Sequence, residues 1–188
     1  MQISSDQALD ALTQVQDAQR RISVLRGYGY AAPYFFLWGS IWVVGYLLSY
    51  LMPSVTSQSW AALDLAGGVG CVLIMRRQRA GTLGDAAVRG RQWRIVAMLL
   101  TAVAFLMLTY AVFQPHDSAQ FAVFPALLAA AIYIGVGLWR GARWLIAGLV
   151  LGALSTVGYF FLHPYILPWM AVAGGGTLLT TGVWLRRT

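Results

Sequence analysis

Six apolar runs alternate with polar stretches along the chain, and each run is near the roughly 20 residues that a helix needs to cross a bilayer. The pattern predicts an all-α integral membrane protein whose six transmembrane helices form three hairpins. An amphipathic segment at residues 1–30 precedes this transmembrane domain of residues 31–188. The expected spans are residues 33–52, 57–75, 95–113, 121–139, 144–162 and 165–185.

The longest polar interruption between two apolar runs is residues 76–94, and its arginines orient the rest of the chain. Arginine is enriched in the cytoplasmic loops of membrane proteins. With six spans, all 13 basic residues of the chain fall on one side, together with both termini. We therefore expect both termini in the cytoplasm, and we expect this loop to set the topology and contact anionic lipid through Arg76, Arg77, Arg79, Arg89, Arg91 and Arg94.

Residues 1–30 have the pattern of an amphipathic helix that ends at Gly27 and Gly29. Ser4 and Gln7 form a capping box at its start. Its three Asp and three Arg balance, whereas helices that lie on lipid usually carry an excess of positive charge. We expect either an external protein partner, or packing of this stripe on the protein's own loops and first span. The apolar stripe comprises Leu9, Leu12, Val15, Ile22 and Leu25.

Composition supports the membrane class and adds little about chemistry. Charged residues make up 10% of the chain, against about 25% in soluble domains. The formal net charge is +7, and every basic residue is arginine and every acidic residue is aspartate, a bias that fits a GC-rich genome. The arginines lie beside spans and are not interleaved with aromatic residues in a soluble module, so we do not expect nucleic-acid binding.

Asp64 is the only ionisable side chain expected within a span away from its arginine-rich end. Intramembrane carboxylates are costly and often functional, although Asp64 lies only one helical turn inside Trp60 and can also be a residue of the membrane boundary. Gly67, Gly68 and Gly70 of the same span indicate close helix packing or local unwinding. The expected partners of its carboxyl group are Tyr46, Ser49, Tyr50, His116 and His163.

Other chemical sites have weak signals. His116, Asp117 and His163 lie in two loops on the side opposite the arginines and can approach one another, but their spacing is not typical of a metal site, and we expect none. No span contains a histidine for haem, and no nucleophile elbow, zinc-protease motif or phosphate loop occurs. We expect no catalytic site and no cofactor.

The sequence therefore predicts a multi-pass protein of the inner (cytoplasmic) membrane of a bacterium. We expect a binding or regulatory module whose N-terminal helix and arginine-rich loop engage a cytosolic protein. The alternative is a small proton-coupled transporter or channel component that uses Asp64. Besides the lipid bilayer, the partners left open are this cytosolic protein and further copies of the chain.

Overall fold

The computed structural model describes residues 5–80 and 86–187, with side chains throughout except at residues 5–11, 16–23, 26, 79–80, 86–95 and 99. Within these residues it is all-helical, and six helices are long and apolar enough to cross a membrane. The elements are α1 (Ser5–Leu51), η1 (Pro53–Val55), α2 (Thr56–Ala80), α3 (Ala86–Phe113), α4 (Ser118–Arg140), α5 (Ala142–Phe161), η2 (His163–Tyr165), α6 (Ile166–Met170), η3 (Ala171–Gly175) and α7 (Gly176–Arg186).

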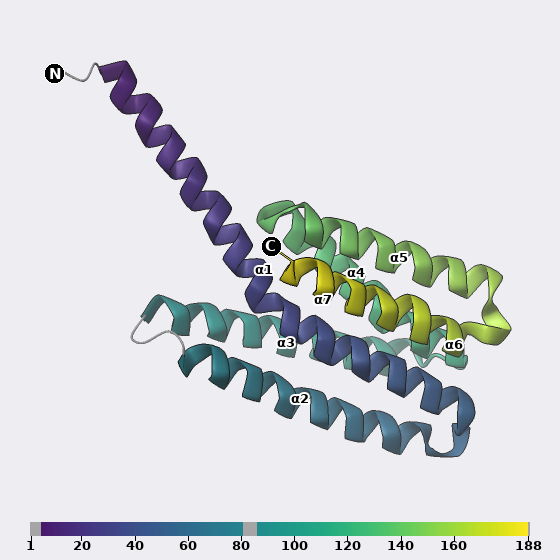
Figure 1. The fold of residues 1–188 in the computed structure, drawn as a ribbon. Helices are drawn as coiled ribbons and strands as arrows, with labels where there is room; N and C mark the ends of the chain where they lie inside the picture. Colours follow the sequence, from purple (N-terminus) through teal and green to yellow (C-terminus); the bar gives the residue numbers. More distant parts are fainter. Residues whose placement is uncertain (1–4, 81–85, 188) are drawn as a thin grey trace.

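The number of spans agrees with the sequence prediction, and their ends differ by a few residues. The apolar helical windows are Gly27–Leu51, Pro53–Gln78, Val96–Phe113, Ser118–Arg140, Ala142–Phe161 and His163–Arg186. Figure 1 shows the ends of α2 and α3, the α4–α5 turn and the C-terminus at one end of the bundle. We name this end, with residues 76–80, 86–94, 140–143 and 186–187, the basic end. The turns at Pro53, Asp117 and His163 lie at the opposite end.

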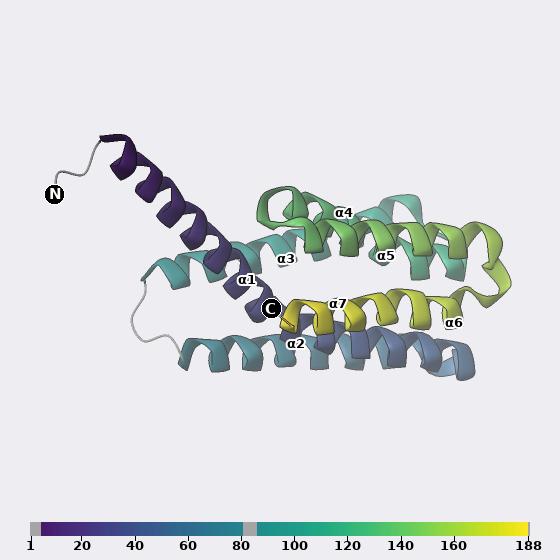
Figure 2. The same ribbon diagram turned by 45° about the horizontal axis from the view of Figure 1, so that its top comes forward.

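The prediction that the N-terminal helix ends at Gly27 and Gly29 is wrong. Helix α1 continues through both glycines to Leu51. A glycine inside a helix costs only about 1 kcal/mol, and tertiary packing offsets this, since Tyr28 and Ala32 between and beyond these glycines are buried. Pro33 lies inside the helix and cannot donate to the carbonyl four residues earlier. Such a proline commonly bends a helix, and Figures 1 and 2 show α1 changing direction where it leaves the bundle.

The predicted loop of residues 76–94 is mostly helical. Helix α2 extends to Ala80 and α3 begins at Ala86, so the arginines of this stretch belong to the last turns of α2 and the first turns of α3. Helix α2 is also continuous through its glycines, which excludes the local unwinding considered for it. Long terminal turns rich in arginine are favourable where a helix leaves a bilayer, since the charged groups reach water and headgroups.

Helices α4 and α5 form the closest pair of the bundle. Their connection is a single residue, Gly141, whose φ of +124° lies in a region that side-chain-bearing residues rarely adopt. Further along, a Cβ on Gly148 would lie 2.7 Å from the Ala130 carbonyl oxygen. The backbones therefore approach closely where Gly148 leaves room, as small residues allow in membrane bundles.

The last span is the most buried one, with 56% of its window inside the described structure. It contacts α1 on one side and the α4–α5 hairpin on the other, and Figure 2 shows it between these layers. Its helix is interrupted by η3, a π-helical turn, where Gly175 faces Val43 and the Gly39 carbonyl of α1. The extra residue of a π turn shifts the side chains that follow it. The windows of α2 and α3 are only 6% and 0% buried.

Candidate functional site

The N-terminal part of α1 is an arm, residues 5–27, that extends away from the bundle (Figure 1). Of its predicted apolar stripe, Leu12, Val15 and Leu25 are exposed by 59%, 53% and 45%. The helix also contains Leu9 and Ile22, whose side chains lie outside the described residues. The described part of the stripe therefore does not pack on the protein's own helices. An exposed apolar row on a projecting helix is suited to contact another apolar surface.

Arg143 fixes the place where the arm leaves the bundle. Its guanidinium carbon lies 5.2 Å from the ring centroid of Tyr28 in α1 and 5.2 Å from that of Trp184 in α7. Its Nη1 also donates a hydrogen bond of 2.8 Å to the Trp184 carbonyl. Guanidinium groups favour such positions over aromatic faces. One side chain of α5 thus joins the root of the arm to the C-terminal helix.

The arginine-rich stretch lies at the basic end, near the root of the arm (Figure 1). Arg76 and Arg77 are exposed on the last turns of α2. Arg79 also belongs to α2, and Arg89, Arg91 and Arg94 belong to the first turns of α3, but their side chains lie outside the described residues. The exposed side chains of Arg76 and Arg77 can therefore contact an anionic surface.

Asp64 lies in α2 and its side chain is exposed. Among the described residues it makes no hydrogen bond or ion pair, and the groups predicted as its partners are engaged elsewhere or exposed. The hydroxyl of Tyr46 donates to the Ala122 carbonyl at 2.7 Å. Ser49 Oγ donates to the Gly45 carbonyl at 2.8 Å and accepts from Trp60 Nε1 at 2.9 Å. None of the predicted partners hydrogen-bonds to Asp64, although Tyr46 lies close enough for an electrostatic interaction with its carboxyl group. Tyr50 and His116 are exposed.

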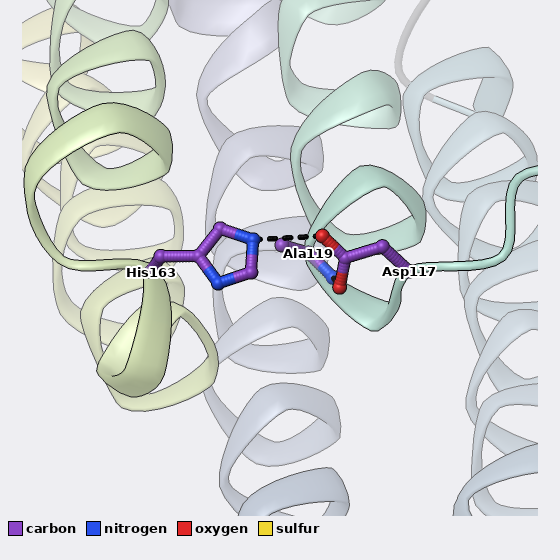
Figure 3. A network of polar contacts seen from close by, with 3 residues as sticks. All are labelled: Asp117, Ala119 and His163. Carbon is purple, nitrogen blue, oxygen red and sulfur yellow. Dashed lines mark hydrogen bonds and ion pairs between the residues drawn. The ribbon is translucent and has the colours of Figure 1, made fainter.

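At the opposite end, Asp117 and His163 form a pair across two turns, as Figure 3 shows. His163 Nε2 and Asp117 Oδ2 are 2.7 Å apart. The other carboxylate oxygen of Asp117 caps α4 by accepting from the Ala119 backbone N–H at 3.0 Å. That backbone hydrogen bond, and then the hydrogen bond and charge of His163, lower the pKa of Asp117 below its ordinary value. His116 is not part of the pair, although the sequence placed it beside the other two.

The geometry of this pair is that of a structural connection. Within the part of the chain that the structure describes, no group of three or more His, Cys, Asp or Glu side chains could hold a metal ion. His163 is about half exposed, and Asp117 about one third. The carboxylate is oriented by the helix N-terminus it caps, which leaves one oxygen for the imidazole. The pair joins the α3–α4 connection to the turn that begins the last span.

A shallow groove of about 280 Å³ runs between α5 and α7. Its walls are mostly apolar, and Thr180, one of its hydroxyl residues, is satisfied by the Gly176 carbonyl at 2.8 Å. The groove adjoins Trp184, on which Arg143 stacks. It holds no titratable side chain and so offers no acid–base chemistry. The lining residues are Ile146, Ala147, Val150, Thr177, Thr180, Thr181 and Trp184.

Sequence reasoning missed two polar features of the bundle. No sequence pattern indicated the contacts of Arg143, because its stacking partners lie far away in the sequence. Ser155 is 1% exposed, and its hydroxyl is the one fully buried side-chain polar atom without a hydrogen-bond partner among the described residues. The sequence also has Arg-Gly, two further residues and an aromatic residue at three places, which begin at Arg26, Arg89 and Arg140. Only at the third place does the glycine form a turn. The pattern therefore does not mark three equivalent structures.

Comparison with known proteins adds no identity. No protein-family description, no curated protein and no solved structure matches the chain. The class that the fold defines is a helical membrane protein with six helices long and apolar enough to span a bilayer.

Proposed function

We propose that this chain is a multi-pass protein of the inner membrane that binds a cytosolic protein through its N-terminal arm. In this arrangement both termini and the basic end lie in the cytoplasm, because a single side then holds all 13 arginines. The observation that carries the proposal is the exposure of Leu12, Val15 and Leu25 on an arm directed away from the bundle.

The arm suits a regulatory role because it is continuous with a buried span. The same helix contains Leu12 in the arm and the buried Phe35, Ile41 and Tyr46 in the bundle. A partner that tilts the arm acts directly on this packed segment, without an intervening flexible linker. Arg143 is placed to respond, since it contacts Tyr28 at the base of the arm and Trp184 in the last helix.

Charge provides a second part of the binding surface. The arm carries equal numbers of Asp and Arg, while the exposed Arg76 and Arg77 lie on the basic end beside it. A cytosolic partner with one apolar groove and an acidic rim complements both features. Anionic lipid competes for the same arginines. The apolar stripe therefore gives the contact its specificity.

The test is site-directed photo-crosslinking of the full-length protein in native membranes. A photoreactive residue at Leu25, or at the exposed Leu100 of α3 as a control position, reports what lies beside each site. We expect a crosslink from position 25 to one soluble protein, lost when Leu12 and Val15 are changed to serine but retained in Gln14→Ser. A crosslink that is equally strong in the Leu12→Ser, Val15→Ser double variant contradicts the proposal.

Removal of residues 1–25 provides the complementary test, because it leaves Tyr28 and every span in place. The shortened protein should insert and accumulate but lose the association. A C-terminal reporter that is active only in the periplasm should be silent when fused after residue 188. Activity of that reporter would overturn the proposed topology.

A further inference from the structure

The groove between α5 and α7 lies at the depth of the leaflet that adjoins the basic end. On α5 it extends to Val150, about 12 Å along the axis from the start of that helix at Ala142. On α7 it extends back to Thr177, about 14 Å from the end of that helix at Arg186. Both depths are less than half of a hydrocarbon core of about 30 Å. A molecule in the groove therefore comes from one leaflet, at the basic end.

Each wall of the groove ends in an arginine on the same side of its helix. On α5, Arg143 precedes the lining residues Ile146 and Ala147 by three and four positions, the spacing of neighbours on one helix face. On α7, Arg187 follows the lining residue Trp184 by three positions. Arg143 Nη1 donates to the Trp184 carbonyl, so the two walls meet at this end. Both arginines therefore lie at one mouth of an apolar groove.

No described carboxylate neutralises these two arginines. The one ion pair among the described side chains joins Asp117 and His163 at the opposite end. Arg187 is exposed, and Arg143 is partly buried. Arg143 uses one of the five N–H groups of a guanidinium for the Trp184 carbonyl, which leaves others for an acceptor. Helix α5 begins at the same mouth, and its N-cap residue offers no side-chain acceptor to the first backbone N–H groups. The mouth is therefore suited to an anion.

We propose that the groove binds one anionic phospholipid, with an acyl chain along the apolar walls and the phosphate at Arg143 and Arg187. Guanidinium groups bind phosphate oxygens through paired hydrogen bonds, and basic pockets between spans bind anionic lipid headgroups. The two arginines favour a headgroup of net negative charge, because a zwitterionic headgroup brings its own cation to the same mouth. We name the groove and these two arginines the lipid site.

A second copy of the chain fits this groove less well than a lipid does. Copies inserted in the same orientation bring identical residues to the same depth, so Arg143 and Arg187 of one copy would meet those of the other. Like charges in contact strongly disfavour an interface. A phospholipid brings the opposite charge and an apolar chain. The inference is independent of the arm and its partner, because the lipid site lies on α5 and α7, and it holds whichever leaflet is cytoplasmic.

The first experiment labels the full-length protein with photoreactive lipid in phosphatidylcholine vesicles at physiological salt. The trace lipid carries a diazirine in its acyl chain and has either a phosphatidylglycerol or a phosphatidylcholine headgroup. We expect the anionic lipid to label Val150 and Trp184 about tenfold more than the zwitterionic lipid, as measured by peptide mass spectrometry. Leu100, which is exposed on α3, is the control position and should be labelled about equally by both. Equal labelling of Val150 and Trp184 by the two lipids overturns the proposal.

The second experiment repeats the labelling with matched arginine variants. Arg187→Gln should lower the labelling of Val150 by phosphatidylglycerol about tenfold, because it removes a charged contact with the phosphate. Arg186→Gln removes the same charge from an exposed position on another side of α7, and should lower the labelling by less than about threefold. Equal losses would show that surface charge alone attracts the lipid, and would overturn the proposal. Arg143 stays unchanged, because its replacement also removes its contacts with α1 and α7.

A further pair of variants tests the groove itself. Val150→Phe places a larger side chain in the groove and should lower the labelling of Trp184 by phosphatidylglycerol about tenfold. Leu149→Phe adds bulk at the adjacent exposed position, outside the lining of the groove, and should leave the labelling within about twofold. Equal labelling of Trp184 in the two variants overturns the groove as the place of the acyl chain.

Competition distinguishes a lipid from a free anion at the same arginines. An excess of unlabelled phosphatidylglycerol should displace the photoreactive lipid, whereas inorganic phosphate should not, because it has no chain to fill the groove. Displacement by inorganic phosphate would overturn the lipid as occupant. Labelling that unlabelled phosphatidylglycerol does not reduce also contradicts the proposal.

Discussion

Arg143 and Trp184 are joined twice, since the guanidinium lies 5.2 Å from the centre of the indole and Nη1 donates a 2.8 Å hydrogen bond to the Trp184 carbonyl. The same guanidinium group also lies over the ring of Tyr28, so Arg143 brings residues of α1, α5 and α7 together. This three-helix contact at the basic end holds the base of the arm.

Replacement of Arg143 should therefore destabilise the bundle. We expect Arg143→Ala to lower the free energy of unfolding by about 2 kcal/mol, from the lost charged hydrogen bond and the two aromatic contacts. Arg143→Lys should recover only part of this, because an ammonium group lacks the planar fork of the guanidinium. Reversible unfolding in mixed micelles, followed by circular dichroism, gives the measurement.

Arg140 is the control for this prediction, because it is exposed and lies only three positions away in the same turn region. Arg140→Ala removes the same charge and should cost less than about 1 kcal/mol, the range of a favourable charge at a helix C-terminus. Equal losses in the two variants would show that total charge, and not the stacking of Arg143, stabilises this end.

The sequence predicted the spans well and their interactions poorly, for a physical reason. Apolar runs and the one-sided arginines report the bilayer, whose thickness and charge asymmetry act on every residue locally. The predicted stop at Gly27 and Gly29 was wrong because Tyr28, which lies between them, is buried against residues far away in the sequence, Arg143 among them. The pairing of Asp117 with His163 was anticipated from two loops at one end, whereas nothing in the spacing distinguished His163 from His116.

The last span shows the same limit. It has three consecutive glycines at 174–176, and α2 likewise has a cluster of three glycines at 67, 68 and 70. Nevertheless α2 is mostly exposed, whereas the last span is the most buried of the six. Glycines permit close approach of helices but do not say which helix approaches. Only the fold shows that η3 of the last span faces α1.

That difference predicts opposite results for neighbouring glycines. A Cβ on Gly175 would lie 2.5 Å from Val43 Cγ2 and 3.0 Å from the Gly39 carbonyl oxygen, whereas one on Gly176 would meet nothing within 4 Å. Gly175→Ala should therefore lower the free energy of unfolding by about 1–3 kcal/mol through overpacking. Gly176→Ala should be neutral or stabilise by up to about 1 kcal/mol. A destabilised Gly176→Ala protein would contradict the observed packing of η3.

The hydroxyl of Tyr46 connects α1 to α4 by its 2.7 Å hydrogen bond to the Ala122 carbonyl. Tyr46 is 3% exposed, so water cannot replace the bond. We expect Tyr46→Phe to lower the free energy of unfolding by about 1 kcal/mol. Tyr50→Phe, one turn along α1 on an exposed ring, should change it by less than about 0.5 kcal/mol. Comparable losses in both variants would argue against a specific role for the bond.

The pair of Asp117 and His163 gives a prediction that depends on pH. Asp117→Ala removes both the cap of α4 and the contact with His163, and should cost about 1 kcal/mol or more at pH 7. Asp117→Asn should cost less, because asparagine also caps helices. The cost that remains is the loss of the carboxylate charge beside His163.

The pKa of Asp117 is below its ordinary value of about 3.9, so the folded protein holds this carboxylate more readily than the unfolded chain does. Its charge therefore stabilises the fold above about pH 4, and this contribution is lost as the pH falls through the lowered pKa. The stability difference between wild type and Asp117→Asn should shrink as the pH falls from about 5 toward 3, because the other carboxyl groups are the same in both proteins. A difference that stays constant to pH 3 would mean that the charge of Asp117 contributes nothing beyond its cap.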